Sequence, residues 1–419
     1  MALFLYNIFL ALYKIGVKVA SLKSKKAKLW LAGRTDIFTN LEKWRAQFPE
    51  KQKIIWMHCA SLGEFEQGRP LIEKLRENNT DHKIILTFFS PSGYEVRKNY
   101  PLADAVFYLP MDGKSNAENF INIVKPTLVF WVKYEYWFYY LTTLKKKNVP
   151  VILISAVFRK SQPFFKWYGK MWSDILQSFN KIFVQNSTSV SLLHTIGLAQ
   201  HAVVTGDTRF DRVIDIAKTT PSLPDVLLQF VKNSKVIIAG STWEEDEEEL
   251  VHYANTYNQI KFIIAPHEID EERLVEVQKL FKNSILFSQL KDNYTNKQVI
   301  IIDNVGMLAS LYQLADVAYI GGGFNDSGIH NILEAAVFGK PIIFGPVYEK
   351  FAEATQLVDA GGAFSIANAL ELERYLDALL KDKNFLANAG AICKKFVYDN
   401  SGATNKIMEY LYEKRLLTN

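Results

Sequence analysis

Short apolar runs alternate with helix-like segments along most of the chain. Runs of this length, bounded by turn residues, are typical of buried strands. The first series of predicted strands comprises residues 54–58, 84–88, 105–108, 128–131, 151–155 and 181–184. The second comprises residues 236–239, 261–265, 284–287, 299–303, 317–320 and 341–344. Helical stretches between strands, such as 66–78 and 115–123, indicate parallel sheets covered on both faces. We therefore predict an α/β fold of two tandem, doubly wound, Rossmann-like domains.

The alternation breaks near residue 216, just before Pro221 and Pro224 stand among small polar side chains in residues 218–224. Closely spaced prolines are typical of a linker. The predicted divisions are an apolar and basic segment at 1–45, a first domain at 46–217, a second at 218–395 and a closing segment at 396–419. Ligands bind beyond the carboxyl ends of strands in such sheets, so two domains predict a cleft between two strand edges.

The amino terminus combines an apolar run with a basic cluster. Residues 2–13 contain one polar side chain, Asn7, whereas a clean membrane span needs about 20 apolar residues. The basic and apolar residues that follow are Lys23, Lys25, Lys26, Lys28 and Arg34, with Leu29, Trp30 and Leu31 among them. This composition predicts an anchor on an anionic bilayer, with the rest of the chain on the cytoplasmic side. The alternative is a first helix buried on the protein.

Charge divides the chain into two unlike halves. Residues 1–200 hold 28 Lys and Arg against 14 Asp and Glu, a balance of +14, while residues 201–419 hold 21 against 30, a balance of −9. Opposite signs predict different partners for the two halves. The acidic second half and the lack of a recognised motif argue against nucleic-acid binding. Two cysteines exclude a disulfide scaffold and a four-cysteine zinc site.

The strongest local signal is the glycine-rich stretch from Gly321 to Gly323, directly after a predicted strand. A helix is expected to start near residues 328–331. The residues predicted to bind a nucleotide here are Gly328, His330, Asn331 and Glu334. Glycines let backbone N–H groups approach a phosphate, and Glu334 is placed to accept hydrogen bonds from ribose hydroxyls. The alternatives are a tight left-handed turn and a solvated glutamate at a helix start.

Other strand ends of the second domain carry residues suited to the same nucleotide. They are Gly240, Ser241, Thr242, Pro266, His267, Gly306 and Met307. Ser241 or Thr242 would cap a helix and contact an anion. The acidic run at 244–249 is predicted to be a solvated helix face. The carboxyl ends of parallel strands meet at one edge, so these loops would surround one ligand.

In the first domain, Glu64 follows the first strand and a stretch of small residues. A carboxylate at this edge is a candidate general base for a sugar hydroxyl. The alternative is an acid that merely favours a helix start, and Glu66 could fill either role. Hydroxyl and basic residues suited to a phosphorylated acceptor follow other strands, namely Ser90, Ser92, Arg97, Lys133, Arg159 and Lys160. Exposed lysines that serve solubility are the alternative.

In their order and spacing, these segments resemble the Kdo transferases, the 3-deoxy-D-manno-octulosonic acid transferases of lipopolysaccharide synthesis. The resemblance covers nearly the whole chain. Its motifs are Gly33-Arg34, His58 to Glu64, Ser90 to Gly93, Tyr108 to Asp112, Ile154 to Ala156, Gly206 to Asp211, Ala239 to Thr242, Gly328 to Glu334 and Lys340 to Pro346.

The resemblance implies a GT-B glycosyltransferase fold and inverting transfer of Kdo from CMP-Kdo to the lipid A precursor, lipid IVA. It implies that Glu64 is the base, that no catalytic metal or cofactor takes part, and that the second domain binds the nucleotide. It also implies that a closing helix at 406–417 crosses back to the first domain. The expected partners are CMP-Kdo, the lipid A precursor and anionic lipids at the cytoplasmic face of the inner membrane.

Three departures from the family pattern affect the expected site. Pro266-His267-Glu268 stands where the family often has P-R-H, so His267 is expected to replace an arginine contact. Around Glu135 only that residue and Trp137 match the usual E-T-E-x-W-P, and Glu135 is expected on the acceptor side. The hydroxyl-rich loop carries serines in place of the usual threonines.

Three other functions are compatible with the sequence. A GT-B transferase could use a UDP-sugar and a lipid or polyprenyl acceptor. A nucleotide-sugar epimerase could share the fold, although it would not need a basic anchor. A catalytically inactive membrane-docked binding protein would not need the glycine loops together with Glu64 and Glu334.

Overall fold

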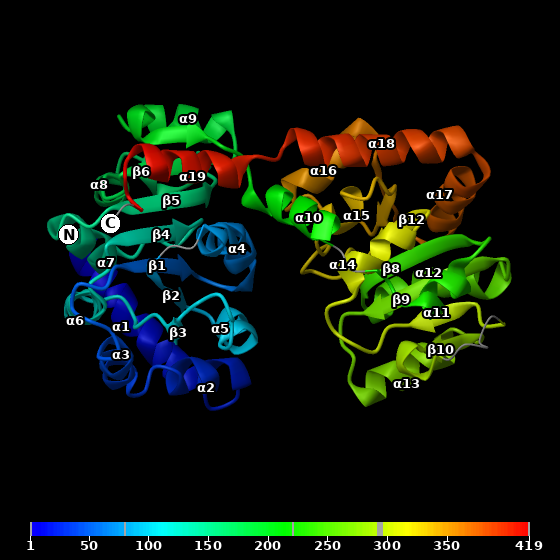
Figure 1. Cartoon of the computed structure of the whole chain (residues 1–419), viewed down its shortest axis with the longest axis horizontal. Helices are drawn as coiled ribbons and strands as arrows, with labels where there is room; N and C mark the ends of the chain where they lie inside the picture. Colours follow the sequence, from blue (N-terminus) through cyan, green and yellow to red (C-terminus); the bar gives the residue numbers. More distant parts are fainter. Residues whose placement is uncertain (1, 79–80, 220–221, 291–295, 418–419) are drawn as a thin grey trace. The chain divides into compact units, whose positions relative to one another are not determined.

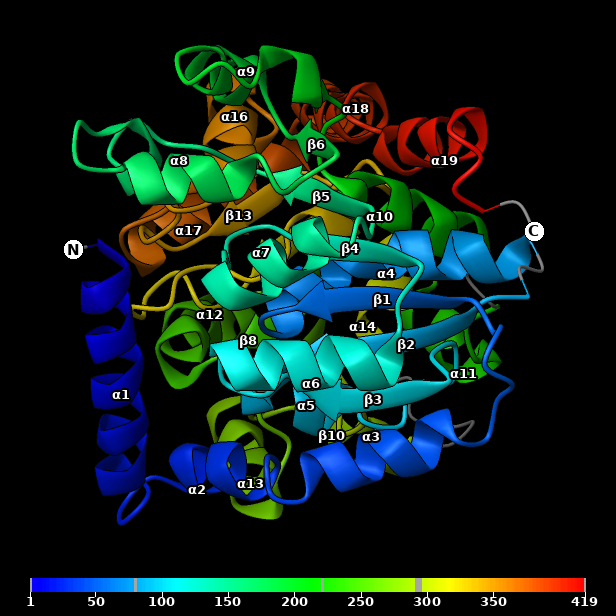
Figure 2. The ribbon, with the colours of Figure 1, turned by 90° about the vertical axis from the view of Figure 1, so that its left-hand side faces the viewer.

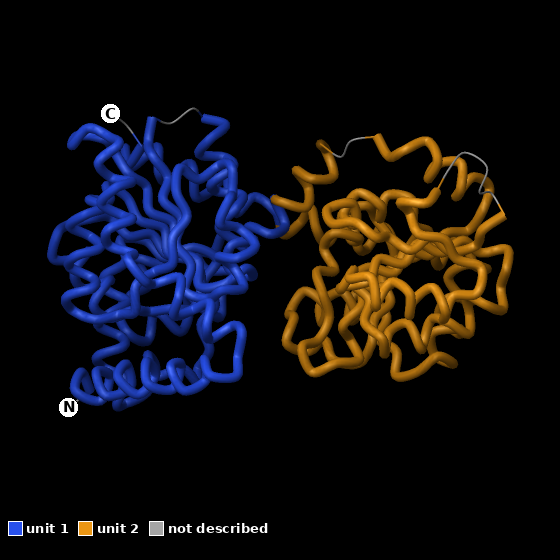
Figure 3. Tube along the Cα trace, turned by 90° about the horizontal axis from the view of Figure 1, so that it is seen from below, with its two compact units in different colours: residues 1–211, 401–419 blue, residues 212–400 orange. Residues whose placement is uncertain are grey.

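Two seven-stranded parallel sheets organise the chain, one in each of two units (Figure 1). The computed structural model describes residues 2–78, 81–219, 222–290 and 296–417. Unit 1 comprises residues 1–211 and 401–419, and unit 2 comprises residues 212–400 (Figure 3). The prediction of two tandem doubly wound α/β domains is confirmed.

The unit 1 sheet has the strand order β3-β2-β1-β4-β5-β6-β7, with every neighbouring pair parallel. Its strands are β1 (Ile54–Cys59), β2 (Lys83–Phe88), β3 (Ala105–Tyr108), β4 (Leu128–Val132), β5 (Val151–Ala156), β6 (Lys181–Val184) and β7 (Ala202–Val204). The sequence prediction missed β7, a partly exposed edge strand whose apolar run is only three residues long. The order of strands reverses between β1 and β4, where doubly wound sheets bind ligands.

Helices cover both faces of this sheet. They are α1 (Ala2–Ala20), α2 (Lys25–Ala32), α3 (Ile37–Arg45), α4 (Leu62–Glu77), α5 (Pro91–Arg97), α6 (Lys114–Val124), α7 (Phe138–Lys146), α8 (Lys170–Leu176), α9 (Ser187–His194) and α19 (Ala403–Glu413). Side chains alternate between faces along a strand. Trp56 therefore joins the core beneath α6 and α7, and Met57 joins the core beneath α4 and α19.

Helix α1 buries only one stripe against the rest of unit 1 (Figure 2). Tyr6 and Leu10 are buried, Tyr13 and Val17 are partly buried, and this spacing places all four on one helix face. The Tyr6 hydroxyl donates to Oδ2 of Asp112 at 2.6 Å. Apolar side chains on the remaining surface are exposed, namely Leu3, Phe4, Leu5, Ile8, Phe9, Leu12, Ile15 and Val19. By length and composition alone α1 could cross a membrane.

Arg34 ties α2 to the strand ends of unit 1. Its guanidinium donates to the carbonyl oxygens of Trp30 at 2.9 Å, Phe89 at 2.8 Å and Leu109 at 2.9 Å. Its central carbon also lies 3.8 Å from the centroid of the Trp30 ring, and burial lowers the pKa of Arg34 to about 9. A side chain at Gly33 would overlap the ring of Tyr108, so glycine is required there. The Gly33-Arg34 motif therefore has a structural role.

The unit 2 sheet has the order β10-β11-β9-β8-β12-β13-β14, again entirely parallel. Its strands are β8 (Lys235–Thr242), β9 (Ile260–Pro266), β10 (Ser284–Leu286), β11 (Val299–Ile301), β12 (Val317–Ile320), β13 (Ile342–Phe344) and β14 (Ala363–Ser365). Its helices are α11 (Asp225–Val231), α12 (Glu244–Thr256), α13 (Glu271–Leu280), α14 (Leu308–Leu311), α15 (Leu333–Ala336), α16 (Ala352–Ala360), α17 (Ala369–Lys381) and α18 (Lys383–Asp399). The strand order reverses between β8 and β12.

The chain leaves and re-enters unit 1 beside Asp211. Helix α10 (Thr208–Thr219) continues through residue 217, the predicted end of the first domain, and the division between units falls within that helix. Thr220 and Pro221 of the predicted linker lie outside the described residues. At the return, the backbone N–H groups of Gly402 and Thr404 donate to the Asp211 carboxylate, the latter at 2.6 Å. Ile407 and Leu411 of α19 are then buried in unit 1.

We predict that Asp211→Ala weakens the attachment of α19, because two amides at the helix start lose their acceptor. The loss of such a cap typically costs about 1 kcal/mol. Amide hydrogen exchange over residues 403–413 of the full chain should accelerate accordingly. Asp382→Ala is the matched control because Asp382 caps α18 in unit 2, accepting from Asn384 N at 2.8 Å. Unchanged α19 exchange in Asp211→Ala would contradict this assignment.

Candidate active site

Two carboxylates follow the strands that flank the switch point of unit 1. Glu64 lies in the first turn of α4, directly after β1, and Glu135 lies in the loop after β4. Because β1 and β4 are hydrogen-bonded neighbours, their carboxyl ends share one sheet edge. Doubly wound sheets present ligand-binding groups at this edge.

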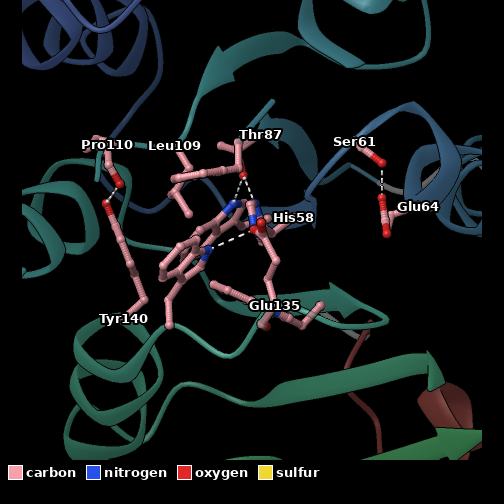
Figure 4. A network of polar contacts seen from close by, with 12 residues as sticks. His58, Ser61, Glu64, Thr87, Leu109, Pro110, Glu135 and Tyr140 are labelled. Carbon is pink, nitrogen blue, oxygen red and sulfur yellow. Dashed lines mark hydrogen bonds and ion pairs between the residues drawn. The ribbon is translucent and has the colours of Figure 1, made fainter. Parts of the chain in front are cut away.

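Glu64 is partly exposed and receives a hydrogen bond from the Ser61 hydroxyl (Figure 4). Ser61 is the residue before α4, and its carbonyl oxygen accepts from Phe65 N at 3.1 Å. Glu66, the other candidate, is held by Arg97 at 3.0 Å and by Arg69 at 3.8 Å. Of the two carboxylates, Glu64 is therefore the one not engaged by cations.

His58 and Glu135 form the centre of a polar network (Figure 4). His58 is fully buried at the end of β1, where the sheet register places it between Thr87 of β2 and Trp131 of β4. Its Nδ1 lies 2.9 Å from Thr87 Oγ1, and its Nε2 lies 3.2 Å from Glu135 Oε2. Trp137 Nε1 donates to the same carboxylate oxygen at 2.8 Å. Neither His58 nor Thr87 was predicted as a site residue, although His58 begins one of the motifs, because the contact between them depends on the pairing of two strands.

The other residues predicted to bind the acceptor differ in their contacts and in their exposure. Ser90 caps α5, with its hydroxyl oxygen 3.3 Å from Ser92 N and 3.0 Å from Ser92 Oγ. Arg97 is partly exposed and lies 3.0 Å from Glu66, which offsets part of its charge, and its role toward the acceptor stays a prediction. Lys133 adopts a left-handed backbone with φ of 64° and lies 4.8 Å from the Tyr134 ring centroid. Arg159 is exposed.

In unit 2, the ends of β8 and β12 are joined by closely packed glycines. Ile320 at the end of β12 pairs with Gly240 of β8. A side chain at Gly321 would overlap the Ser241 carbonyl, and Gly322 has φ of 91°, which favours glycine. The register shift at the end of β8 gives Ser241 a positive φ of 55°. The tight left-handed turn, which was the alternative to an anion site, is therefore present, and the two backbones also approach each other closely.

Two carboxylates of α12, Asp246 and Glu247, are buried and hold this arrangement, which corrects the predicted solvated face at these two positions. Glu244, Glu245 and Glu248 are exposed, as predicted. Asp246 is fully buried and accepts hydrogen bonds from Gly322 N at 2.7 Å and Trp243 N at 2.9 Å. Burial raises the pKa of Asp246 despite these donors. Glu247 is also fully buried, and burial raises its pKa to about 7. It accepts the Thr242 hydroxyl at 2.7 Å, so that hydroxyl is already engaged within the protein.

Three aromatic rings stack beside the glycine loop. The Trp243 and His267 ring centroids are 4.5 Å apart, and those of His267 and His330 are 4.6 Å apart, with interplanar angles of 25° and 26°. Trp243 Nε1 donates to His330 Nε2 at 3.2 Å. Burial and the neighbouring His267 lower the pKa of His330 to about 4, so its ring is neutral near pH 7. The structure thus brings the ends of β8, β9 and β12 together.

The segment after the glycine loop is less helical than predicted. Helix α15 begins at Leu333 and has four residues, so the expected helix start near residues 328–331 is wrong. Asn331 accepts from Leu333 N at 3.1 Å and donates to Glu334 Oε1 at 3.1 Å. Gly328 adopts φ of 82°, in keeping with a turn.

The remaining predicted nucleotide residues lie at neighbouring strand ends. Pro266 is buried at the end of β9, paired in register with Thr242. Gly306 and Met307 lie in the loop between β11 and α14, and Met307 Sδ accepts from Asn304 at 3.1 Å. Within the described ranges, no cluster of three His, Cys, Asp or Glu side chains could hold a metal ion.

Comparison with known proteins identifies the chemistry associated with this architecture. Residues 37–212 match the family model described as 3-deoxy-D-manno-octulosonic-acid transferase (kdotransferase). A 3-deoxy-D-manno-octulosonic acid transferase of Haemophilus influenzae is 28% identical, covering 94% of this chain and 93% of the relative. Another such transferase, from Aquifex aeolicus, is 28% identical, covering 78% of this chain and 86% of the relative. A bifunctional glycosyltransferase/methyltransferase of Fusobacterium nucleatum is 25% identical over 80% of this chain, which spans 53% of its length.

Solved structures establish the fold independently. A UDP-GlcNAc 2-epimerase from Neisseria meningitidis, bound to UDP-GlcNAc, matches with a TM-score of 0.59 and 17% identity, covering 86% of this chain and 100% of that one. A further UDP-N-acetylglucosamine 2-epimerase matches with a TM-score of 0.60 and 15% identity, covering 88% and 98%. These likenesses concern the two-domain GT-B fold alone. The matches in sequence go further: the family model over residues 37–212 and the two relatives at 28% identity support the Kdo transferase family for this chain.

Proposed function

We propose that this chain transfers Kdo from CMP-Kdo to the lipid A precursor, lipid IVA, in the synthesis of the lipopolysaccharide inner core. The observation that carries the proposal is the position of Glu64. It stands at the switch-point edge of unit 1, oriented by Ser61, and no cation pairs with it among the residues that the structure describes. The family match supplies the substrate class, and the carboxylate supplies a base for a hydroxyl nucleophile.

The donor side of the proposal rests on unit 2. The N–H groups of Gly321 and Gly322 are already engaged by Gly240 O and Asp246, so the backbone N–H groups proposed to contact a small anion, such as the single phosphate of CMP-Kdo, are those later in the same loop. The neutral His330 ring accepts from Trp243 through Nε2, which leaves its Nδ1–H as the donor. Glu334, held by Asn331, is proposed to accept from the ribose hydroxyls. Ser241, rather than the engaged Thr242, is the hydroxyl proposed to contact the phosphate.

The proposed reaction is a single displacement with inversion. A hydroxyl oxygen of the acceptor attacks the anomeric carbon of Kdo as the bond from that carbon to the phosphate oxygen breaks. The hydroxyl proton passes to Glu64, and CMP leaves with the electron pair of the broken bond. Backbone donors around the glycine loop stabilise the charge that develops on the phosphate. The residues in these roles need no metal ion to complete the proton and charge balance.

Replacing Glu64 by Gln removes the proposed base while preserving its shape. We expect the rate of Kdo transfer from CMP-Kdo to lipid IVA to fall by about 10²–10⁴-fold, the usual contribution of a general base. CMP affinity, measured by calorimetry, should stay unchanged because unit 2 is untouched. Glu77→Gln in the last turn of the same helix is the control, since that side chain is exposed. Turnover of Glu64→Gln near that of the control would eliminate Glu64 as the base.

His330→Ala should weaken CMP binding by about tenfold, corresponding to one lost hydrogen bond and its stacking contact. Because its pKa is about 4, the loss should be the same at about pH 6 and about pH 8. His252→Ala is the control, because His252 is an exposed side chain of α12 paired with Glu373. Titration with UDP in parallel tests the rival UDP-sugar enzyme, for which UDP would bind more tightly than CMP. Equal CMP affinity in His330→Ala and His252→Ala would remove His330 from the site.

We also propose that unit 1 docks on the cytoplasmic face of the inner membrane through α1. The exposed apolar stripe of that helix, beside the lysines of residues 23–28, supports insertion into an anionic interface. The buried stripe and the bond from Tyr6 to Asp112 support a helix lying along the protein rather than one surrounded by lipid.

The double substitution Phe4→Asp and Phe9→Asp places charge in this stripe, where the two phenylalanines are 67% and 52% exposed. We expect the protein to lose most of its cosedimentation with vesicles containing anionic phospholipid, because each buried charge opposes insertion. Leu228→Asp changes an exposed leucine of unit 2 and should leave binding intact. Retained vesicle binding by the double variant would refute docking through α1.

A further inference from the structure

A directed chain of hydrogen bonds runs from the core of unit 1 to Glu135 (Figure 4). Trp56 Nε1 lies 2.8 Å from Thr87 Oγ1, and this oxygen lies 2.9 Å from His58 Nδ1. His58 Nε2 then meets Glu135 Oε2 at 3.2 Å. Trp56, Thr87 and His58 are all fully buried, so water does not compete for these bonds.

The chemistry of each group fixes the direction of this chain. An indole nitrogen can only donate, so Thr87 Oγ1 accepts from Trp56. Thr87 Oγ1 has a second lone pair, so the bond from Trp56 alone does not fix its role toward His58. The Glu135 carboxylate can only accept, so His58 Nε2 carries the proton and donates it to Glu135. In the neutral imidazole the lone pair then lies on Nδ1, which accepts the Thr87 hydroxyl proton.

Glu135 is consequently held by one oxygen and open at the other. Its Oε2 accepts from both His58 and Trp137, while its Oε1 has no hydrogen-bond partner among the described residues. The side chain is 23% exposed, so the open oxygen belongs to a carboxylate that reaches the surface of the site. Trp131 Nε1 separately donates to the backbone carbonyl of Glu135. The loop is thus attached to the sheet without His58, whose bond is made to the carboxylate alone.

We propose that His58 is a positioning residue that orients Glu135, so that Oε1 accepts a hydrogen bond from a hydroxyl of the acceptor sugar. This inference rests on the proposed function, because it assumes a sugar acceptor in unit 1. In this arrangement Glu135 binds one hydroxyl of the acceptor sugar, and Glu64 accepts the proton of the hydroxyl that attacks the donor. The acceptor-only carboxylate of Glu135 sets the His58 tautomer, and the Thr87 hydroxyl, which accepts from Trp56, donates to the lone pair on Nδ1.

The kinetic test compares His58→Gln with His58→Leu in the full chain. A glutamine amide can donate from about the position of Nε2, whereas leucine has similar bulk and no donor. We expect His58→Leu to raise the KM for lipid IVA about tenfold or more, with CMP affinity unchanged. His58→Gln should recover most of this loss. Equal KM values for the two variants, whether both normal or both raised, would overturn the proposal.

The spectroscopic test needs no substrate. Nitrogen-15 chemical shifts of the imidazole identify which ring nitrogen carries the proton, and we expect Nε2–H for His58 in the wild-type chain. Thr87→Ser retains the hydroxyl and should retain this tautomer, while Thr87→Val should shift the Nδ1 resonance. A proton on Nδ1 in the wild type would overturn the inference. Failure of wild-type transfer with CMP-Kdo would instead refute the proposed function, leaving the tautomer result to decide the role of His58.

Discussion

A parallel sheet that is buried on both faces can present reactive polar groups only at its edges, where the strands end. The interior of such a sheet leaves no room for unpaired donors or charges, because each would lose its hydration without compensation. At the carboxyl edge the strands diverge on either side of the reversal in strand order, and loops there can expose polar groups. In unit 1 this edge carries Glu64 and Glu135, and in unit 2 it carries the glycines after β12.

The two edges use buried charge in different ways. In unit 2, the buried carboxylates of Asp246 and Glu247 hold backbone and hydroxyl groups beside the glycine loop. In unit 1, the buried His58 imidazole and the Ser61 hydroxyl orient two carboxylates that are partly exposed. The excess of acidic residues in the second half of the chain therefore includes carboxylates that are buried and hydrogen-bonded inside unit 2.

The apolar runs sufficed to predict the two sheets, because continuous burial imposes continuous apolar sequence. They did not reveal β7 or β14, which are three-residue edge strands with little to bury. Predictions from composition were wrong where contacts between distant residues bury a polar side chain. The run at 244–249 looks solvated, but the tight glycine loop needs the acceptor that Asp246 supplies. The ion pair between Arg97 and Glu66 joins two helices across 31 positions of sequence, so no local pattern predicts it. His58 was overlooked because its importance depends on register with β2, which no local pattern encodes.

The bond between Asp211 and the start of α19 has a consequence for how the protein is made. The helix that covers one face of the first sheet is translated after all 189 residues of unit 2, residues 212–400. At about 5–20 residues per second, ribosomal synthesis of that intervening stretch takes about 10–40 seconds. During this interval the apolar surface that receives Ile407, Met408 and Leu411 lacks its cover. Unit 1 begins to fold first but finishes last, so a chaperone that shields this face would act while the chain is still attached to the ribosome.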